Sequence, residues 1–254
     1  EGINLVDNPN FTDTGSELVT DGDFSSGANW YEGTGCSISG NQGVFTSAPS
    51  GSGFTGDNLN AAICVIGKSY KVTYTIDSIT SGSVGLRHPF TGTYYDNTSS
   101  FPLDVTEYVV ADNTSIYIQN SGTTTATISN VSVKELGADW TLGSSWSVGD
   151  DKAVSDGTVG NYALQQTIFS GSELGNFFKV QYEITSYTSG TLLLRSTGFH
   201  GQLAIDNSVG VHTLYLEAIS TSTDLVFVTQ SAGFTGSISN ISVQELGEGW
   251  TLGT

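Results

Sequence analysis

The chain has 254 residues, of which 7 are basic and 25 acidic, so its formal net charge at pH 7 is −18. This acidic excess excludes nucleic acid and anionic membrane surfaces as partners, because both carry the same sign of charge. Only 13% of the residues are charged, and glycine, serine, threonine and asparagine are abundant, which is typical of a turn-rich β protein. No run of about 18 apolar residues is present, so we expect no membrane insertion.

The chain begins with a short segment whose pattern recurs. Residues 5–11 read LVDNPNF, and residues 18–24 read LVTDGDF. We interpret residues 1–17 as a leader that partly duplicates the entry into the first domain. The sequence contains no methionine, so we expect that a leader peptide or a further region precedes Glu1.

A longer stretch also occurs twice. Residues 128–143 read ISNVSVKELGADWTLG and residues 238–253 read ISNISVQELGEGWTLG, which gives a period of 110 residues (238 − 128). The chain is therefore a tandem repeat. We predict one β domain over residues 18–137 and a second over 138–247, with residues 248–254 starting a further repeat or serving as an assembly strand.

Alternating apolar residues predict the strands inside each repeat. Tyr70 to Asp77 and Phe178 to Thr185 each place every second apolar side chain on one face, as in a half-buried antiparallel strand. A Ser-Gly pair follows in both repeats, which predicts a turn before the next strand. We equate Trp30 with Trp146 as core residues, which gives the first repeat about eight additional residues before Lys71. No helical periodicity is present, so we expect almost no helix.

The entry segments, the middle strand and the closing Ile-Ser-Asn-Val/Ile-Ser-Val strand together resemble the jelly-roll carbohydrate-binding modules. They also look like the repeats along tail fibres and other surface proteins of marine bacteriophages. The resemblance covers almost the whole chain from Leu18 onward and implies two tandem antiparallel β-sandwich domains of the jelly-roll, galactose-binding-like type. Its motifs are short and apolar, so it argues for the fold more strongly than for a ligand.

The resemblance also implies where a structural calcium ion would bind. Members of the family commonly use an opening Glu and a closing Asp, but this chain has Ser25 or Thr141 and Ser129 or Ser239 at those positions. We therefore expect no cofactor. The alternative is a calcium held by the remaining oxygen ligands of the two repeats, which are Asp21, Asp23, Asn130, Asp139 and Asn240.

Arginine and loop aromatics are the candidate glycan contacts. Arg87 and Arg195 take equivalent strand-end positions, where a guanidinium could form a fork of hydrogen bonds to sugar hydroxyls or a carboxylate. The alternative for each is a structural ion pair with a nearby acid. Aromatics outside the strand alternation are expected to be exposed. They are Tyr94 and Tyr95 in the first repeat and Phe199 in the second.

Two cysteines and several sequons complete the candidate sites. Cys36 and Cys64 could form a disulfide in an oxidising compartment, or remain buried free thiols. Asn10, Asn97 and Asn113 begin Asn-x-Ser/Thr sequons and are the candidate glycosylation sites. The three histidines show no metal-binding spacing, and no catalytic constellation stands out.

We interpret the chain as a non-enzymatic protein of an extracellular or virion-surface fibre, assembling through contacts between domains and between chains. We expect the terminal segments Ile3 to Phe11 and Trp250 to Thr254 to be ordered by strand addition to a neighbouring unit. The alternative is a glycan-binding adhesion module for attachment to a host or surface. The expected partners are further copies, other fibre or virion proteins, and surface glycans.

Overall fold

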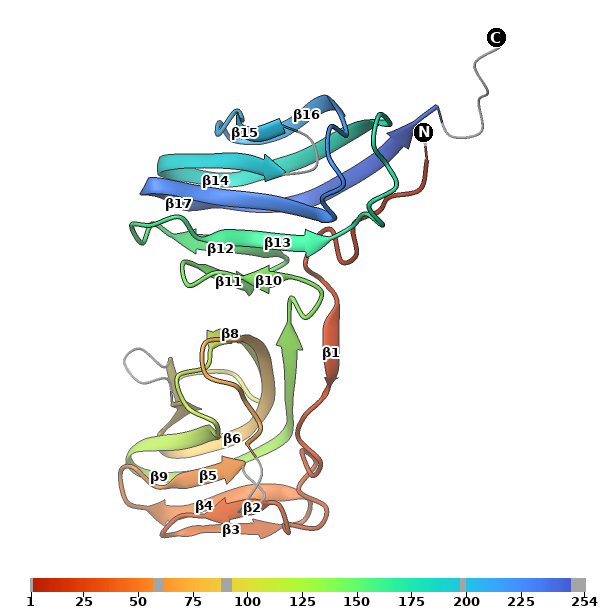
Figure 1. The fold of residues 1–254 in the computed structure, drawn as a ribbon. Coiled ribbons are helices and arrows are strands. Elements are labelled where there is room, and N and C mark those ends of the chain that lie inside the picture. Colours follow the sequence, from red (N-terminus) through yellow and green to blue (C-terminus); the bar gives the residue numbers. More distant parts are fainter. Residues whose placement is uncertain (1, 57–61, 88–92, 197–199, 248–254) are drawn as a thin grey trace. The chain divides into compact units, whose positions relative to one another are not determined.

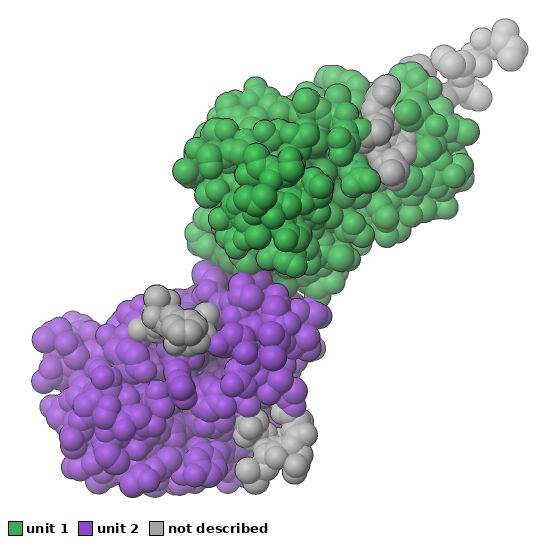
Figure 2. Space-filling model, turned by 60° about the vertical axis from the view of Figure 1, so that its left-hand side comes forward, with its two compact units in different colours: residues 1–13, 136–254 green, residues 14–135 purple. Residues whose placement is uncertain are grey.

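The computed structural model describes residues 2–56, 62–87, 93–196 and 200–247. It divides into two compact units, coloured separately in Figure 2. We call Thr14–Glu135 the first body, and Glu1–Asp13 together with Leu136–Thr254 the second body. The described residues form antiparallel strands and no helix, so no membrane-spanning helix is found among them. The predicted fold class, two tandem antiparallel β-sandwiches of jelly-roll type, is confirmed.

The first body is a single antiparallel sheet folded over its own core (Figure 1). Its path runs β2-β5-β9-β4-β3, with β1 on β9, with β6 pairing β9, and with β7 and β8 on β6. The strands are β1 (Thr14–Glu17), β2 (Trp30–Glu32), β3 (Cys36–Ser39), β4 (Gln42–Ala48), β5 (Gly53–Gly56), β6 (Ser69–Leu86), β7 (Tyr94–Asp96), β8 (Leu103–Val110) and β9 (Ile116–Leu136).

The second body repeats this arrangement with the path β10-β13-β17-β12-β11, and with β14 pairing β15, β16 and β17. Its strands are β10 (Thr141–Leu142), β11 (Trp146–Gly149), β12 (Lys152–Asp156), β13 (Ala163–Thr167), β14 (Phe177–Ser196), β15 (His200–Ala204), β16 (Gly210–Glu217) and β17 (Asp224–Leu246).

Each body is built on its two longest strands, β6 with β9 and β14 with β17, which pair along most of their length (Figure 1). The predicted Ser-Gly turns are wrong, because the long strands continue through them. Gly82 and Gly190 instead adopt φ of 72° and 88° at register shifts of the ladder. Such bulges bend a strand without ending it, and glycine adopts positive φ without steric cost.

The cores confirm the predicted alternation. The inward residues of the middle strands are all at most 1% exposed, and the remaining core is mostly aromatic and β-branched. Burying each of these large side chains contributes about 1.5–3 kcal/mol, which makes this stripe the main stabilising feature of either body. The inward residues are Tyr70, Val72, Tyr74 and Ile76 on β6, and Phe178, Val180, Tyr182 and Ile184 on β14.

The repeated Ile-Ser-Asn motif forms a bulge in the closing strand of each body. Asn130 and Asn240 have φ of 54° and 49°, and the ladder shifts register beside each of them. Asparagine tolerates this left-handed conformation better than most residues. The residue after each Asn then donates its N–H to another segment: Val131 to the carbonyl of Gly22, at 2.8 Å, and Ile241 to that of Pro9, at 2.9 Å.

The acceptors of these hydrogen bonds lie in two equivalent entry segments. We call residues 18–24 the first entry segment and residues 5–11 the second, since the second packs on the second body. Leu18 donates to the carbonyl of Val133 at 3.0 Å, and Leu5 donates to that of Val243 at 2.9 Å. The leader therefore supplies the first strand-like element of the second body. The chain then forms the first body and returns to the second only at residue 136.

The pairing register corrects one predicted equivalence. The indole of Trp30 donates to the carbonyl of Asp21, and that of Trp140 donates to the carbonyl of Asn8. Trp30 therefore matches Trp140, whereas Trp146 occupies the place of Cys36, because each donates its N–H to the glycine three residues before it. The 110-residue offset also holds at Gly53 and Ala163, so the expected eight-residue excess does not lie before β5.

The left-handed asparagine generates a stability prediction. Replacing Asn130 by Val should lower the free energy of unfolding of the first body by about 1–3 kcal/mol, because a β-branched residue is strained at positive φ. Asn130→Gly should retain most of that free energy. Urea denaturation of the three proteins measures the difference, and equal losses for Val and Gly would contradict the assignment of strain.

Glu17 generates a pH prediction. Burial alone would raise its pKa, but hydrogen bonds from the Ser132 hydroxyl and from the N–H groups of Val133, Val19 and Leu18 hold the pKa below its usual range. A carboxylate with a lowered folded pKa stabilises above its unfolded pKa and loses that contribution as pH falls.

The second body has the neutral Asn4 in the same place, accepting from Val243 and Val6. We therefore expect Glu17→Gln to reduce the loss of first-body stability below about pH 4.5. Hydrogen exchange at Val133 against Val243 as pH falls measures this, and acid sensitivity unchanged by the substitution would contradict it.

Candidate functional site

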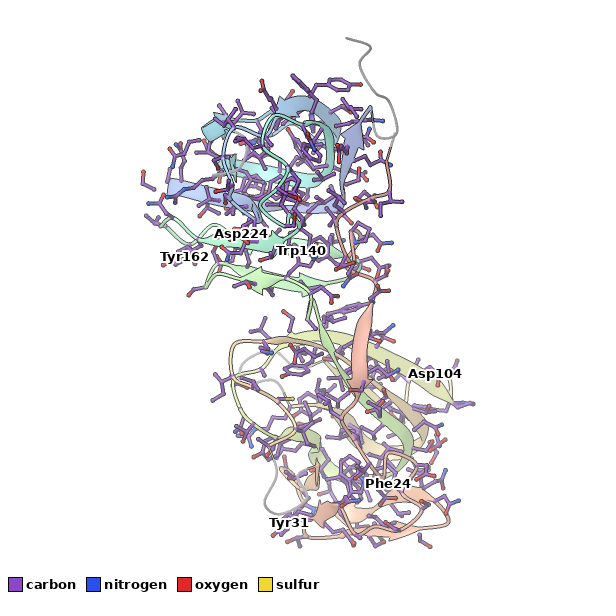
Figure 3. The ribbon with its side chains drawn as sticks, turned by 45° about the vertical axis from the view of Figure 1, so that its right-hand side comes forward. Phe24, Tyr31, Asp104, Trp140, Tyr162 and Asp224 are labelled. Carbon is purple, nitrogen blue, oxygen red and sulfur yellow. The ribbon has the colours of Figure 1, made fainter. Side chains whose placement is uncertain are left out.

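A groove of about 320 Å³ opens on the first body between β2, β5 and the start of β9. Its most exposed wall is Tyr31, which is 58% exposed, while the preceding Trp30 is 7% exposed. Successive residues of a strand point to opposite faces, so burying Trp30 presents Tyr31 outward. Figure 3 shows Tyr31 at the surface of this body. The side chains that give the groove its chemistry are Tyr31, Thr34, Ser52, Arg87, Tyr117 and Gln119.

Arg87 is held over an aromatic ring at the other side of the groove. It follows β6 directly, and its N–H donates to the carbonyl of Tyr117 at 2.8 Å. Its guanidinium carbon lies 5.7 Å from the centroid of the Tyr117 ring, within cation–π range. Among the described residues no carboxylate forms an ion pair with it. Arg87 thus lies over the ring and lines both the groove and the hollow beside it.

Two further features make the groove polar. The Gln119 side chain donates to the carbonyl of Gly51 at 2.7 Å, which fixes the amide and leaves its oxygen as an acceptor. On the far side of Arg87 lies a smaller hollow of about 110 Å³, to which Asp112 and Asn113 contribute. This surface therefore offers both hydrogen-bond donors and hydrogen-bond acceptors to a ligand.

The chemistry of the described groove lining is suited to binding a polar ligand. The described residues that line it include no carboxylate, histidine or cysteine. An aromatic face, a guanidinium, an amide and hydroxyl groups are suited to recognising a hydroxyl-rich ligand through stacking and hydrogen bonds.

The second body has the same strands without the same groove chemistry. The place of Tyr31 is taken by Thr141, since these residues pair with Thr55 and Gln165 respectively. The same ladder places Val226 where the first body has Tyr117, and Val228 where it has Gln119. Arg195 is exposed at the end of β14, but the residue below it is Val226 in place of an aromatic ring.

The predicted glycan contacts have mixed outcomes. Arg87 lies in the groove, whereas Tyr94 and Tyr95 belong to β7 and do not form a loop cluster. Their side chains point to opposite faces: Tyr94 is exposed, and Tyr95 packs against the core. Burial and the nearby Glu107 raise the pKa of Tyr95. Phe199 lies outside the described residues.

Sequence reasoning missed Tyr31, Tyr117 and Gln119. The signal was present, because Tyr117 stands between two apolar residues and must face away from the core if they face in. Both neighbours, Ile116 and Ile118, are buried.

Of the candidate calcium ligands, Asp21 has both carboxylate oxygens occupied by hydrogen bonds. The Asp21 carboxylate accepts the N–H groups of Ser26 and Gly27, at 3.0 and 2.7 Å, and the Ser25 hydroxyl. Burial would raise its pKa, but these hydrogen bonds lower it. Across the described ranges, no three His, Cys, Asp or Glu side chains are grouped so that they could hold a metal.

The other candidate ligands make hydrogen bonds through various atoms. Asp23 accepts the N–H of Ser25, and the Asn130 amide donates to the hydroxyl groups of Thr75 and Ser129. Asn240 donates to Glu183 at 2.6 Å, and the carbonyl of Asp139 accepts from the Gln166 side chain.

Both cysteines are free thiols. Burial raises the pKa of Cys36 and of Cys64 to about 11, with Glu32 and Glu135 adding to the respective shifts.

The three candidate glycosylation sites differ in exposure. Asn97 and Asn113 are exposed, and Asn10 is half-buried in the second entry segment. The Asn10 side chain accepts the hydroxyl of Thr12 at 2.8 Å.

No protein-family model and no curated protein matches this sequence. Among solved structures, the chain is similar to the N-terminal CBM22-1-CBM22-2 tandem domain of Xyn10C from Paenibacillus barcinonensis. That match has a TM-score of 0.33 and 6% identity, and covers 94% of this chain and 91% of that one.

It is also similar to the tandem CBM51 modules of Sp3GH98, the family 98 glycoside hydrolase from Streptococcus pneumoniae SP3-BS71. The TM-score is 0.27 and the identity 11%, with 92% of this chain and 97% of that chain covered. Both TM-scores are too low to carry an inference about what this chain binds.

The thiols generate a reactivity prediction. With pKa values of about 11, both should stay protonated and resist iodoacetamide at pH 8 in the folded protein, since the thiolate is the nucleophile. Both should react rapidly in guanidinium, where the pKa returns to about 8.5. Mass spectrometry counts the adducts, and rapid modification of Cys64 in the native protein would contradict its burial.

Proposed function

We propose that the chain is a carbohydrate-binding module whose ligand site is the groove of the first body. The observation that carries the proposal is the Arg87 guanidinium held over Tyr117 and facing a polar groove walled by the exposed ring of Tyr31. A sugar ring would stack on Tyr31, while Arg87 and the Gln119 oxygen bond its hydroxyl groups.

The comparison between the two bodies supports this assignment. They share strands, register and entry segments, yet only the first combines Tyr31, Tyr117 and Gln119; the second has Thr141, Val226 and Val228 at those places. A structural requirement of the fold would act on both bodies alike. The first body is therefore the binding body, and the second serves another purpose.

A structural role in an extracellular or virion-surface fibre is the second candidate. The feature that favours it is the strand-like addition of residues 2–11 to the second body, with Asn4 bridging to Gln244. Binding and assembly are compatible within one appendage. The location of the protein and its virion partners stay predictions.

Substitution in the groove tests the binding proposal. Arg87→Ala and Tyr31→Ala should each weaken binding to a glycan identified on an array by about tenfold or more, because central anchors contribute most of the free energy of binding. The matched controls are Arg195→Ala in the second body and Tyr94→Ala on the exposed face of β7. The proposal fails if the array gives no ligand, or if all four variants bind alike.

A further inference from the structure

The second entry segment completes a body from which it is distant in the chain. The first entry segment runs directly into β2 of its own body, with five residues between Phe24 and Trp30. The second ends at Phe11, and the whole first body separates it from Trp140. The two bodies share the main path of strands, so this discontinuity distinguishes the second body.

The docked segment is part of the core. Val6 is 5% exposed and Phe11 is 1% exposed, and the Phe11 ring lies 5.2 Å from that of Trp140. The Asn8 carbonyl accepts the Trp140 indole N–H at 3.3 Å. Figure 3 shows Trp140 within this body. Without residues 5–11 these groups would face water, so the second body is incomplete on its own.

The acceptor also holds a buried side chain that binds this segment and, in addition, donates to the carbonyl of Asp139 at 3.0 Å. Gln166 is 7% exposed, accepts the N–H of Asp7 at 2.8 Å and donates to the Asp7 carbonyl at 3.0 Å. The same position in the first body is Gly56, which makes no such contact. A buried amide that pairs with both polar groups of one residue recognises extended backbone, as in strand addition.

We infer that the second body is a strand-acceptor site that takes the N-terminal segment of a second copy of this chain. Every contact of residues 2–11 described here lies within the second body, so a segment from another copy makes the same contacts. Two short connections would have to rearrange, residues 12–13 and the Gly137–Asp139 linker. Head-to-tail repetition of this exchange links copies into an oligomer or a filament.

Peptide complementation tests the acceptor. The full-length chain with Val6→Asp and Phe11→Asp loses its own docked segment, and a labelled peptide of residues 1–13 should then bind one-to-one in fluorescence anisotropy. The assay runs at about 0.15 M salt, where repulsion between acidic chains is screened beyond about 8 Å. A peptide carrying Phe11→Asp should bind at least about tenfold more weakly, as expected from the loss of a buried aromatic side chain.

The matched acceptor control is Gln166→Ala in the same leader-defective chain, which should also weaken binding of the intact peptide. Equal affinity of both peptides, or no binding to a folded leader-defective chain, overturns the inference.

Subunit exchange tests the second copy and does not depend on the leader-defective chain folding. Unlabelled and ¹⁵N-labelled wild-type chains are unfolded together, refolded at high concentration and examined by native mass spectrometry. Mixed-isotope dimers that persist on dilution, and that decrease with Gln166→Ala, are expected. Monomers alone at every concentration overturn the exchange.

Discussion

The closing strand of each body must leave its ladder at one residue to accept the entry segment, and most of the structure depends on that departure. Asn130 and Asn240 adopt left-handed backbone, which turns the next N–H away from the sheet and toward Gly22 or Pro9. The entry segment then covers the core with Phe24 or Phe11 and aligns a tryptophan indole. The motif most repeated in the sequence thus docks a segment onto the closing strand.

The two bodies use this device for different ends. In the first, the entry segment is continuous with the domain, and the outer surface carries the polar groove with Arg87 and Tyr117. In the second, the groove residues are replaced, while Gln166 is added where the first body has Gly56. The polar side chains that differ between the bodies therefore lie in different places, in the groove of the first body and against the entry segment in the second. Because the repeats differ at these positions, a site found in one body does not imply the same site in the other.

The fold was largely predictable, because alternation and a 110-residue period report directly on burial and register. Tyr70 to Ile76 and their counterparts pointed inward as expected. The errors arose where local sequence looks the same for two conformations: a Ser-Gly pair serves a turn or a bulge equally well. Trp30 was matched to Trp146 by spacing from the entry motif, whereas hydrogen bonding across the sheet equates it with Trp140. The lining of the groove was only partly predictable: Arg87 lies in it, but Tyr31 and Tyr117 come from strands far apart in the chain and were not singled out.

The order of the entry segments along the chain has a consequence for biosynthesis. Residues 5–11 leave the ribosome before either body, but their partner strand β17 ends at Leu246, so every residue up to Leu246 must be made before they can dock. At about 5–20 residues per second this takes roughly 12–50 seconds, during which the first body can already fold. Throughout that interval residues 5–11 have no partner strand in their own chain.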